Sequence, residues 1–157
     1  MIQKKAKLTF SKNSSADKAF SAVVRLLARR DHSVLELKKK LSRYHETQAI
    51  EAAIERATER DYIKDPQNLT TAFSRDLNAR NKSYRKIKSA LAQKGLKPPP
   101  YDISIELAKC RQLLVKKYGS TQSLSASERV KVYRYLTNRG FDLETIKKAI
   151  SSNESDS

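Results

Sequence analysis

The sequence predicts an all-α protein of tandem three-helix units, with about eight helices in an elongated, curved array. Apolar residues recur at spacings of three and four through most of the chain, as they do on one face of a helix. Glycine occurs only three times and tryptophan is absent, which favours helices joined by short turns over a turn-rich β fold. A motif of Arg, two polar residues, Ser and a helical apolar spacing that ends on Leu occurs at 29–41 and again at 79–91, which indicates a repeat.

The first unit, residues 17–63, is predicted to contain three helices. A helix near 17–30 has Asp17 as its expected N-cap. The next begins after Ser33 with a capping box, because Glu36 stands three residues later. A third helix spans about 46–60. The expected inward faces are Phe20, Val23, Val24 and Leu27, then Val34, Leu37, Leu41 and Tyr44, then Ile50, Ala53, Ile54 and Ala57.

The second unit, residues 64–101, is predicted to contain two helices and a connector. Asp65-Pro66 is a helix start, with Asp as the cap and Pro where no amide is needed. Ser83 caps a second helix that stops at Gly95. Consecutive prolines make a third helix impossible over 97–101, where we expect an extended connector. The expected inward faces are Leu69, Phe73 and Leu77, then Tyr84, Ile87 and Leu91.

The third unit, residues 102–150, is predicted to contain three helices. The first runs from about Asp102 to Tyr118. The second begins after Ser125 with another capping box and stops at Gly140. Asp142 caps the last. The expected inward faces are Ile103, Leu107, Cys110 and Leu114, then Val132, Tyr135 and Leu136, then Leu143, Ile146 and Ile150.

The two ends are predicted to lie outside the helical domain. Residues 1–16 form a basic arm with too few apolar residues to fold, and 151–157 form a polar tail. No long apolar run occurs, so we expect neither a membrane span nor a secretory signal. Cys110 is the single cysteine, which excludes an internal disulfide, suits the reducing cytoplasm and is expected to be a small core residue. We expect a cytoplasmic monomer.

The chain is strongly basic, with 33 basic and 17 acidic residues and a net charge of +16. The excess is concentrated in the middle. Residues 63–97 carry nine positive and two negative charges, whereas 17–62 carry ten and eight. Because solubility does not require such a concentration, we expect a polyanionic partner, either nucleic acid or an acidic protein surface.

Basic residues at repeated helix corners and on exposed helix faces are the candidate contacts with this partner. The helix after Ser83 is the clearest case, since no acidic residue occurs between 77 and 97 and like charges on one helix repel. An ordinary solvated face is the alternative for 38–40, and a favourable helix C-terminus is the alternative for Arg139. The candidates are Arg29, Arg30, Lys38, Lys39, Lys40, Arg43, Arg80, Lys82, Arg85, Lys86, Lys88, Lys94, Arg129, Lys131, Arg134 and Arg139.

Catalytic motifs are not found in the sequence. His32 and His45 are not spaced as a metal pair, and His32 is expected to make a local hydrogen bond beside a cap. There is no glycine-rich phosphate loop, and no serine has a recognisable base and orienting group. We therefore expect no enzymatic activity, no metal and no cofactor.

Several segments resemble the successive signatures of the RecX family, regulators of the RecA recombinase. They are LLARRDHSVLELKKKL, DYIKD, SYRKIKSALAQKGL, VKKYG and YRYLTNRGF, in the family's order over about 17–150. The resemblance implies an elongated protein of three-helix units that binds RecA filaments along their groove. It implies damping of ATP hydrolysis, recombination and coprotease activity, and hence a role in DNA repair and the SOS response. Many members also bind DNA, single- or double-stranded.

Two departures from the family pattern and one competing function accompany this resemblance. Prolines at 98–100 stand where the family usually has a helix, and Lys64 replaces an acid. The competing function is a stand-alone DNA-binding protein, since the corners resemble helix-turn-helix geometry. It would not read sequence, because lysines favour phosphate contacts. An RNA-binding accessory role has no aromatic stacking platform to support it.

Overall fold

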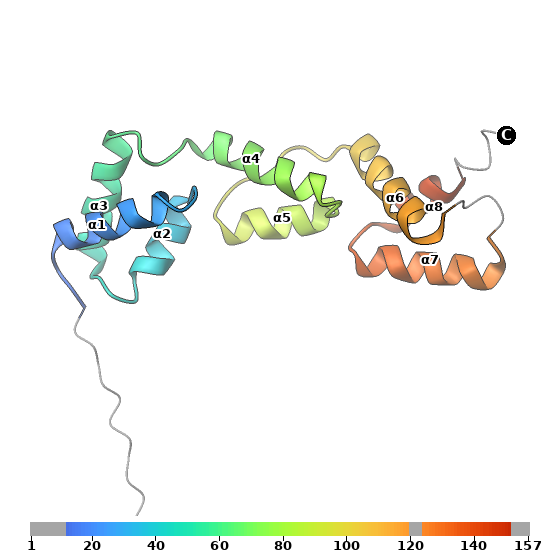
Figure 1. Cartoon of the computed structure of the whole chain (residues 1–157), viewed down its shortest axis with the longest axis horizontal. Helices are drawn as coiled ribbons and strands as arrows, with labels where there is room; N and C mark the ends of the chain where they lie inside the picture. The colour runs from blue at the N-terminus through green and yellow to red at the C-terminus, as the bar shows by residue number, and fades with distance from the viewer. Residues whose placement is uncertain (1–11, 120–123, 152–157) are drawn as a thin grey trace, which may run out of the picture. The chain divides into compact units, whose positions relative to one another are not determined.

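The computed structural model describes residues 12–119 and 124–151, and these residues form eight helices and one isolated β-bridge (Figure 1). The chain divides into two compact units, Met1–Leu69 and Thr70–Ser157, with one helix crossing the boundary. The predicted all-α repeat class is confirmed, as is the absence of a helix over 97–101. No helix of the described chain is long and apolar enough to cross a membrane. The helices are α1 (Ala16–Leu27), α2 (Val34–Leu41), α3 (Thr47–Glu59), α4 (Pro66–Ala79), α5 (Tyr84–Gln93), α6 (Ile103–Tyr118), α7 (Ala126–Asn138) and α8 (Leu143–Ser151).

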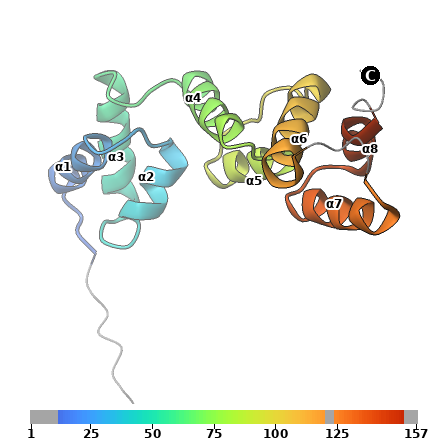
Figure 2. The same cartoon turned by 45° about the vertical axis from the view of Figure 1, so that its right-hand side comes forward.

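In the Met1–Leu69 unit, α1, α2 and α3 share one apolar core (Figures 1 and 2). The capping box of α2 is confirmed: Glu36 N donates to Ser33 Oγ at 3.2 Å, and Ser33 N donates to Glu36 Oε2 at 3.1 Å. All four residues predicted for the inward face of α3 are buried, as are Val23, Leu37 and Leu41. Periodicity and caps therefore predict this unit well.

The ends of these helices differ from the prediction. Ser15, not Asp17, caps α1 by accepting a hydrogen bond from Lys18 N at 3.4 Å. Val34 and Tyr44 are exposed, because Val34 is the first residue of α2 and Tyr44 lies beyond its last turn. Asn13 exchanges backbone hydrogen bonds with the 44–46 corner, so the described part of the predicted 1–16 arm belongs to the folded unit. Residues 1–11 lie outside the described residues.

In the Thr70–Ser157 unit, α6, α7 and α8 enclose a second apolar core. The predicted caps are confirmed: Asp102 for α6, the Ser125–Glu128 box for α7, and Asp142, which accepts from Thr145 N, for α8. The prediction that Leu143 faces inward is wrong, because its side chain is 56% exposed at the first position of α8. Phe73 and Leu77 of α4 are only half-buried. Ser151 ends α8, and 152–157 lie outside the described residues.

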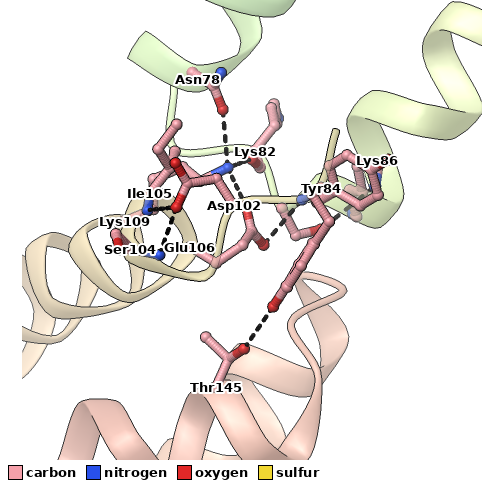
Figure 3. A network of polar contacts seen from close by, with 12 residues as sticks. Asn78, Lys82, Tyr84, Lys86, Asp102, Ser104, Ile105, Glu106, Lys109 and Thr145 are labelled. Atoms are coloured by element: carbon pink, nitrogen blue, oxygen red, sulfur yellow. Dashed lines mark hydrogen bonds and ion pairs between the residues drawn. The ribbon is translucent and has the colours of Figure 1, made fainter. Parts of the chain in front are cut away.

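A buried ion pair connects α6 to the corner between α4 and α5 (Figure 3). Lys109 pairs with Glu106 and donates to Asn78 Oδ1 at 2.9 Å and to the Lys82 carbonyl oxygen at 2.8 Å. The second oxygen of Glu106 accepts from Tyr84 N, the first amide of α5, at 2.9 Å. All three ammonium donors of Lys109 therefore have partners, which a buried charge requires.

A second contact joins α5 to the turn after α7. Ser83 Oγ donates to the Arg139 carbonyl oxygen at 2.9 Å, and the next residue is Gly140. A Cβ at position 140 would lie 2.6 Å from Ser83 Oγ, and the backbone φ there is +94°, so only glycine fits. The glycine of the RGF segment thus stops α7 and also lets α5 approach it.

Replacing Lys109 with Met should strongly destabilise the Thr70–Ser157 unit. The change leaves the Glu106 carboxylate buried without its partner, which costs about 3–5 kcal/mol of unfolding free energy. Urea unfolding followed by circular dichroism measures the loss. Lys148→Met is the matched control, because Lys148 makes an exposed ion pair with Glu144 on α8. Equal losses of unfolding free energy in the two variants would contradict a stabilising role for the buried ion pair.

Cys110 should resist thiol reagents in the folded protein. The side chain is fully buried in the α6–α8 core, and burial raises the pKa of its thiol to about 12. Almost no thiolate, the reactive form, is therefore present at neutral pH. Labelling with a disulfide reagent should require urea; rapid labelling in native buffer would show that Cys110 is not part of the core.

Candidate functional site

A basic concavity lies where α6 and α7 end and α4 meets α5, and we call it the C-terminal basic hollow. It has a volume of about 520 Å³ and no acidic residue in its lining. Four cations line it, and a tyrosine stands among them. The lining residues are Ala79, Arg80, Asn81, Leu113, Lys116, Lys117, Tyr135 and Arg139.

Two of the four cations are held against the tyrosine. Lys117 Nζ lies 3.8 Å from the ring centroid of Tyr135, and the Arg139 guanidinium lies 4.6 Å from it. Such cation–π contacts orient long basic side chains without removing their charge. Arg80 makes an exposed ion pair with Asp76 at 3.1 Å. The hollow therefore keeps a strong positive potential.

The buried ion pair of α6 brings the residues of this hollow together. Lys109 binds Asn78 and the carbonyl of Lys82, which flank Arg80 and Asn81 in the corner between α4 and α5. Lys116 lies two helical turns after Lys109 on α6. The same contacts that hold the corner thus place Arg80 beside the basic end of α6.

A second basic concavity, the N-terminal basic hollow, lies between the ends of α1 and α2. Its volume is about 540 Å³. Three cations surround an apolar floor, and Tyr44 is 62% exposed at its edge. The lining residues are Ala22, Arg25, Leu26, Arg29, Lys40, Leu41, Tyr44 and His45.

At least seven of the sequence-predicted contact residues make contacts within the fold, among them Arg43 and Arg139, which lie 5.7 Å and 4.6 Å from the ring centroids of Tyr44 and Tyr135. Arg30 pairs with Glu36 at 3.0 Å, and Lys38 lies 3.9 Å from Glu51. Lys94 stands 4.4 Å from the ring centroid of Phe73. Two more are Arg80, paired with Asp76, and Arg129, whose Nε donates to the Leu124 carbonyl. These contacts reduce the charge or freedom that each offers to a partner.

The exposed residues of the predicted set are only partly brought together by the fold. Arg29 and Lys40 meet in the N-terminal hollow, and Arg139 joins Arg80 in the C-terminal hollow. The prediction stays untested for the exposed set as a whole. The residues on other exposed surfaces are Lys39, Arg43, Lys82, Arg85, Lys86, Lys88, Lys131 and Arg134.

Sequence reasoning missed three cations of the hollows: Arg25, Lys116 and Lys117. Each lies in the last turn of its helix, where a basic residue is ordinarily explained by the helix dipole. A usable signal exists for Lys116, because it follows buried Cys110 of α6 by six positions, as the predicted Arg29 follows buried Val23 of α1.

The histidines have structural surroundings. His32 is buried, its Nδ1 donates to the Arg30 carbonyl at 2.8 Å, and burial lowers its pKa, so the predicted local hydrogen bond is confirmed. His45 Nδ1 is buried and lacks a hydrogen-bond partner among the described residues. Within 12–119 and 124–151, no group of three or more His, Cys, Asp or Glu residues is placed to hold a metal ion.

The amino-acid sequence is similar to known regulatory proteins along most of its length. The family model of the first three-helix domain of RecX matches residues 19–56, and that of the third matches residues 104–150. Regulatory protein RecX of Acinetobacter baylyi is 32% identical over 142 residues, covering 87% of this chain and 88% of the relative. That of Pseudomonas fluorescens (strain SBW25) is 30% identical over 138 residues, covering 83% and 88%. The chain belongs to the RecX family.

Solved structures of this family share the fold. The crystal structure of RecX from Lactobacillus salivarius aligns with a TM-score of 0.71 at 19% identity, covering 88% of this chain and 96% of that one. A second crystal structure of regulatory protein RecX aligns with a TM-score of 0.69 at 17% identity, covering 87% and 73%. Both named departures have visible consequences: the prolines leave 97–101 without a helix, and Lys64 Nζ lies 2.7 Å from Asp31 in an ion pair.

Reversing the charges of Lys82, Lys86 and Lys88 should weaken the salt dependence of DNA binding. All three side chains are exposed on or beside α5, which has no acidic residue. Each neutralised phosphate contributes about −0.7 to −0.9 to the log–log slope of affinity against salt, so the triple Glu variant should flatten the slope by roughly two to three units. Fluorescence anisotropy at several salt concentrations measures this slope for the wild type and the variant.

The matched control is the triple Glu variant of Lys18, Lys38 and Lys39, which makes the same change in charge on α1 and α2 and leaves Lys40 of the N-terminal hollow unchanged. Lys38 already lies near Glu51, so the control should lose less. A larger loss from the control would place the interface on the other unit.

Proposed function

We propose that the protein binds RecA nucleoprotein filaments and lowers RecA ATPase, recombination and coprotease activity, with auxiliary DNA binding. Membership of the RecX family is the observation that supports this proposal, since family domains match both ends of the helical region. The partner is a filament of protein on DNA, and the positive charge of 63–97 suits such a polyanion.

The local structure supports a binding role over a catalytic one. The two basic hollows are lined by cations and aromatic rings and contain no carboxylate that could act as an acid or base. A third, smaller concavity contains Glu106 and Asp142, but both carboxylates accept backbone hydrogen bonds within the fold. The proposed action is therefore steric and electrostatic: the chain occupies surface on the filament and changes what the recombinase can do there.

Substoichiometric protein should lower the rate of DNA-dependent ATP hydrolysis by RecA on single-stranded DNA. One bound chain affects neighbouring subunits of a filament, so an effect is expected below one chain per recombinase. A coupled ATPase assay measures the rate, and co-sedimentation with filaments measures binding. If a molar excess neither lowers the rate nor sediments with the filament, the proposed function is wrong.

The second candidate is a stand-alone DNA-binding protein without sequence preference. The exposed cations Arg85, Lys86 and Lys88 on a helix without acidic residues favour it. The same experiment separates the two functions. A stand-alone binder would lower the ATPase rate only by competing for DNA, so saturating DNA would abolish its effect.

A further inference from the structure

We propose that the two basic hollows are repeat-related phosphate sites, one in each unit, through which one chain holds single-stranded nucleic acid at two points. The proposal deepens the nucleic-acid part of the proposed function and does not depend on RecA. It rests on the equivalence of the hollows within the repeat, on their charge and on their tyrosines.

The two hollows occupy the same place in the three-helix repeat. Taking buried Val23 and Cys110 as equivalent first-helix positions, Leu26 and Leu113 follow three residues later and line their hollows. Six residues after the same anchors, a cation lines each hollow. These cations are Arg29 and Lys116.

The second helix of each three-helix repeat, α2 or α7, also contributes equivalent positions to its hollow. Buried Leu41 and Leu136 are the anchors, and each hollow is lined by the residue before its anchor and by the residue three positions after it. In the first unit these are Lys40 and Tyr44, and in the last they are Tyr135 and Arg139. Both units thus present one cation and one tyrosine four residues apart, in opposite order. Four lining positions of the two hollows are therefore equivalent within the repeat, whereas Ala79, Arg80 and Asn81 of the C-terminal hollow have no counterpart in the lining of the N-terminal one.

The charges in the hollows favour an anionic ligand. Four cations in one hollow and three in the other have no carboxylate within either lining. Like charges gathered in a concavity repel one another, and a bound anion relieves that repulsion. Guanidinium and ammonium groups together suit a phosphate, which accepts several charge-assisted hydrogen bonds at once.

The tyrosines favour single-stranded nucleic acid over a duplex or an acidic peptide. Tyr44 is mostly exposed beside Arg29 and Lys40, and the Arg43 guanidinium lies 5.7 Å from its ring centroid, so an unpaired base can stack on the exposed part of the ring while the adjacent phosphate meets the cations. Tyr135 has two cations closer to its ring, which makes the C-terminal hollow the more purely phosphate-directed site. Neither arrangement reads base edges, so binding should be independent of sequence.

Counting short oligonucleotides bound per chain tests the proposal without RecA. An oligothymidylate of about six nucleotides, within the ~4–16-nucleotide sites of single-strand-binding folds, is too short to be assumed to bridge the hollows. Native mass spectrometry and calorimetry at low salt should give two bound per wild-type chain. Arg25→Gln with Arg29→Gln should leave one, Lys116→Gln with Lys117→Gln should leave one, and the combined variant none. On a long oligothymidylate, either pair of changes should reduce affinity by about 10²–10⁴-fold through lost avidity.

Controls make each outcome decisive. Lys18→Gln with Lys147→Gln removes one exposed charge from each unit away from both hollows and should still bind two. Circular dichroism checks that every variant stays helical. One oligonucleotide per wild-type chain, or two in either hollow variant, overturns the proposal. Equal occupation by hexaglutamate or by a short duplex overturns the choice of single-stranded nucleic acid. If the chain still inhibits RecA in those cases, the proposed function stands and this inference alone fails.

Discussion

The buried charge of Lys109 is the constraint on which the Thr70–Ser157 unit depends. An ammonium group removed from water destabilises a protein unless each of its donors has a partner, and here the partners are Glu106, Asn78 and the carbonyl of Lys82. Two of these come from the α4–α5 corner, which has no third helix to pack against because prolines follow at 98–100. The ion pair therefore holds this corner against α6, and Arg80 and Asn81 of the corner line the C-terminal basic hollow.

Most helices were predictable because their signals are local. Capping serines and apolar spacing depend on residues within one or two turns, and they located all eight helices and the break at the prolines. Some misses lie at helix ends, as at Val34 and Leu143, and others have non-local causes. Glu106 and Lys109 are charged and so look like solvated positions, yet partners more than twenty residues away make them core residues. Likewise, no single stretch of the sequence shows that Arg80 and Lys116 line one hollow, because only the folded chain brings them together.

The segments that identify the family are mainly structural. In RDHS, Arg30 pairs with Glu36, His32 binds the Arg30 carbonyl, and Ser33 caps α2. In RGF, the absence of a side chain at Gly140 lets Ser83 contact the turn after α7. Each contact fixes a corner between helices, which sets the geometry of the repeat. Recognition of the family therefore rests partly on residues that shape the scaffold, and the same segments also contain cations of the two hollows, such as Lys116, Lys117 and Arg139.

Net charge along the sequence does not show where the fold concentrates positive charge. Arg30, Lys64 and Arg80 each lie against a carboxylate, so part of the positive excess stabilises the fold rather than projecting from it. The remaining charge gains effect where geometry concentrates it, since a concave wall of low dielectric focuses the field of the cations that line it. A hollow with three or four cations and no carboxylate in its wall attracts an anion more strongly than the same charges spread along a helix. The charge count over 63–97 points to the middle of the chain, whereas the concave sites with the densest unopposed charge lie at the ends of α1 and α6.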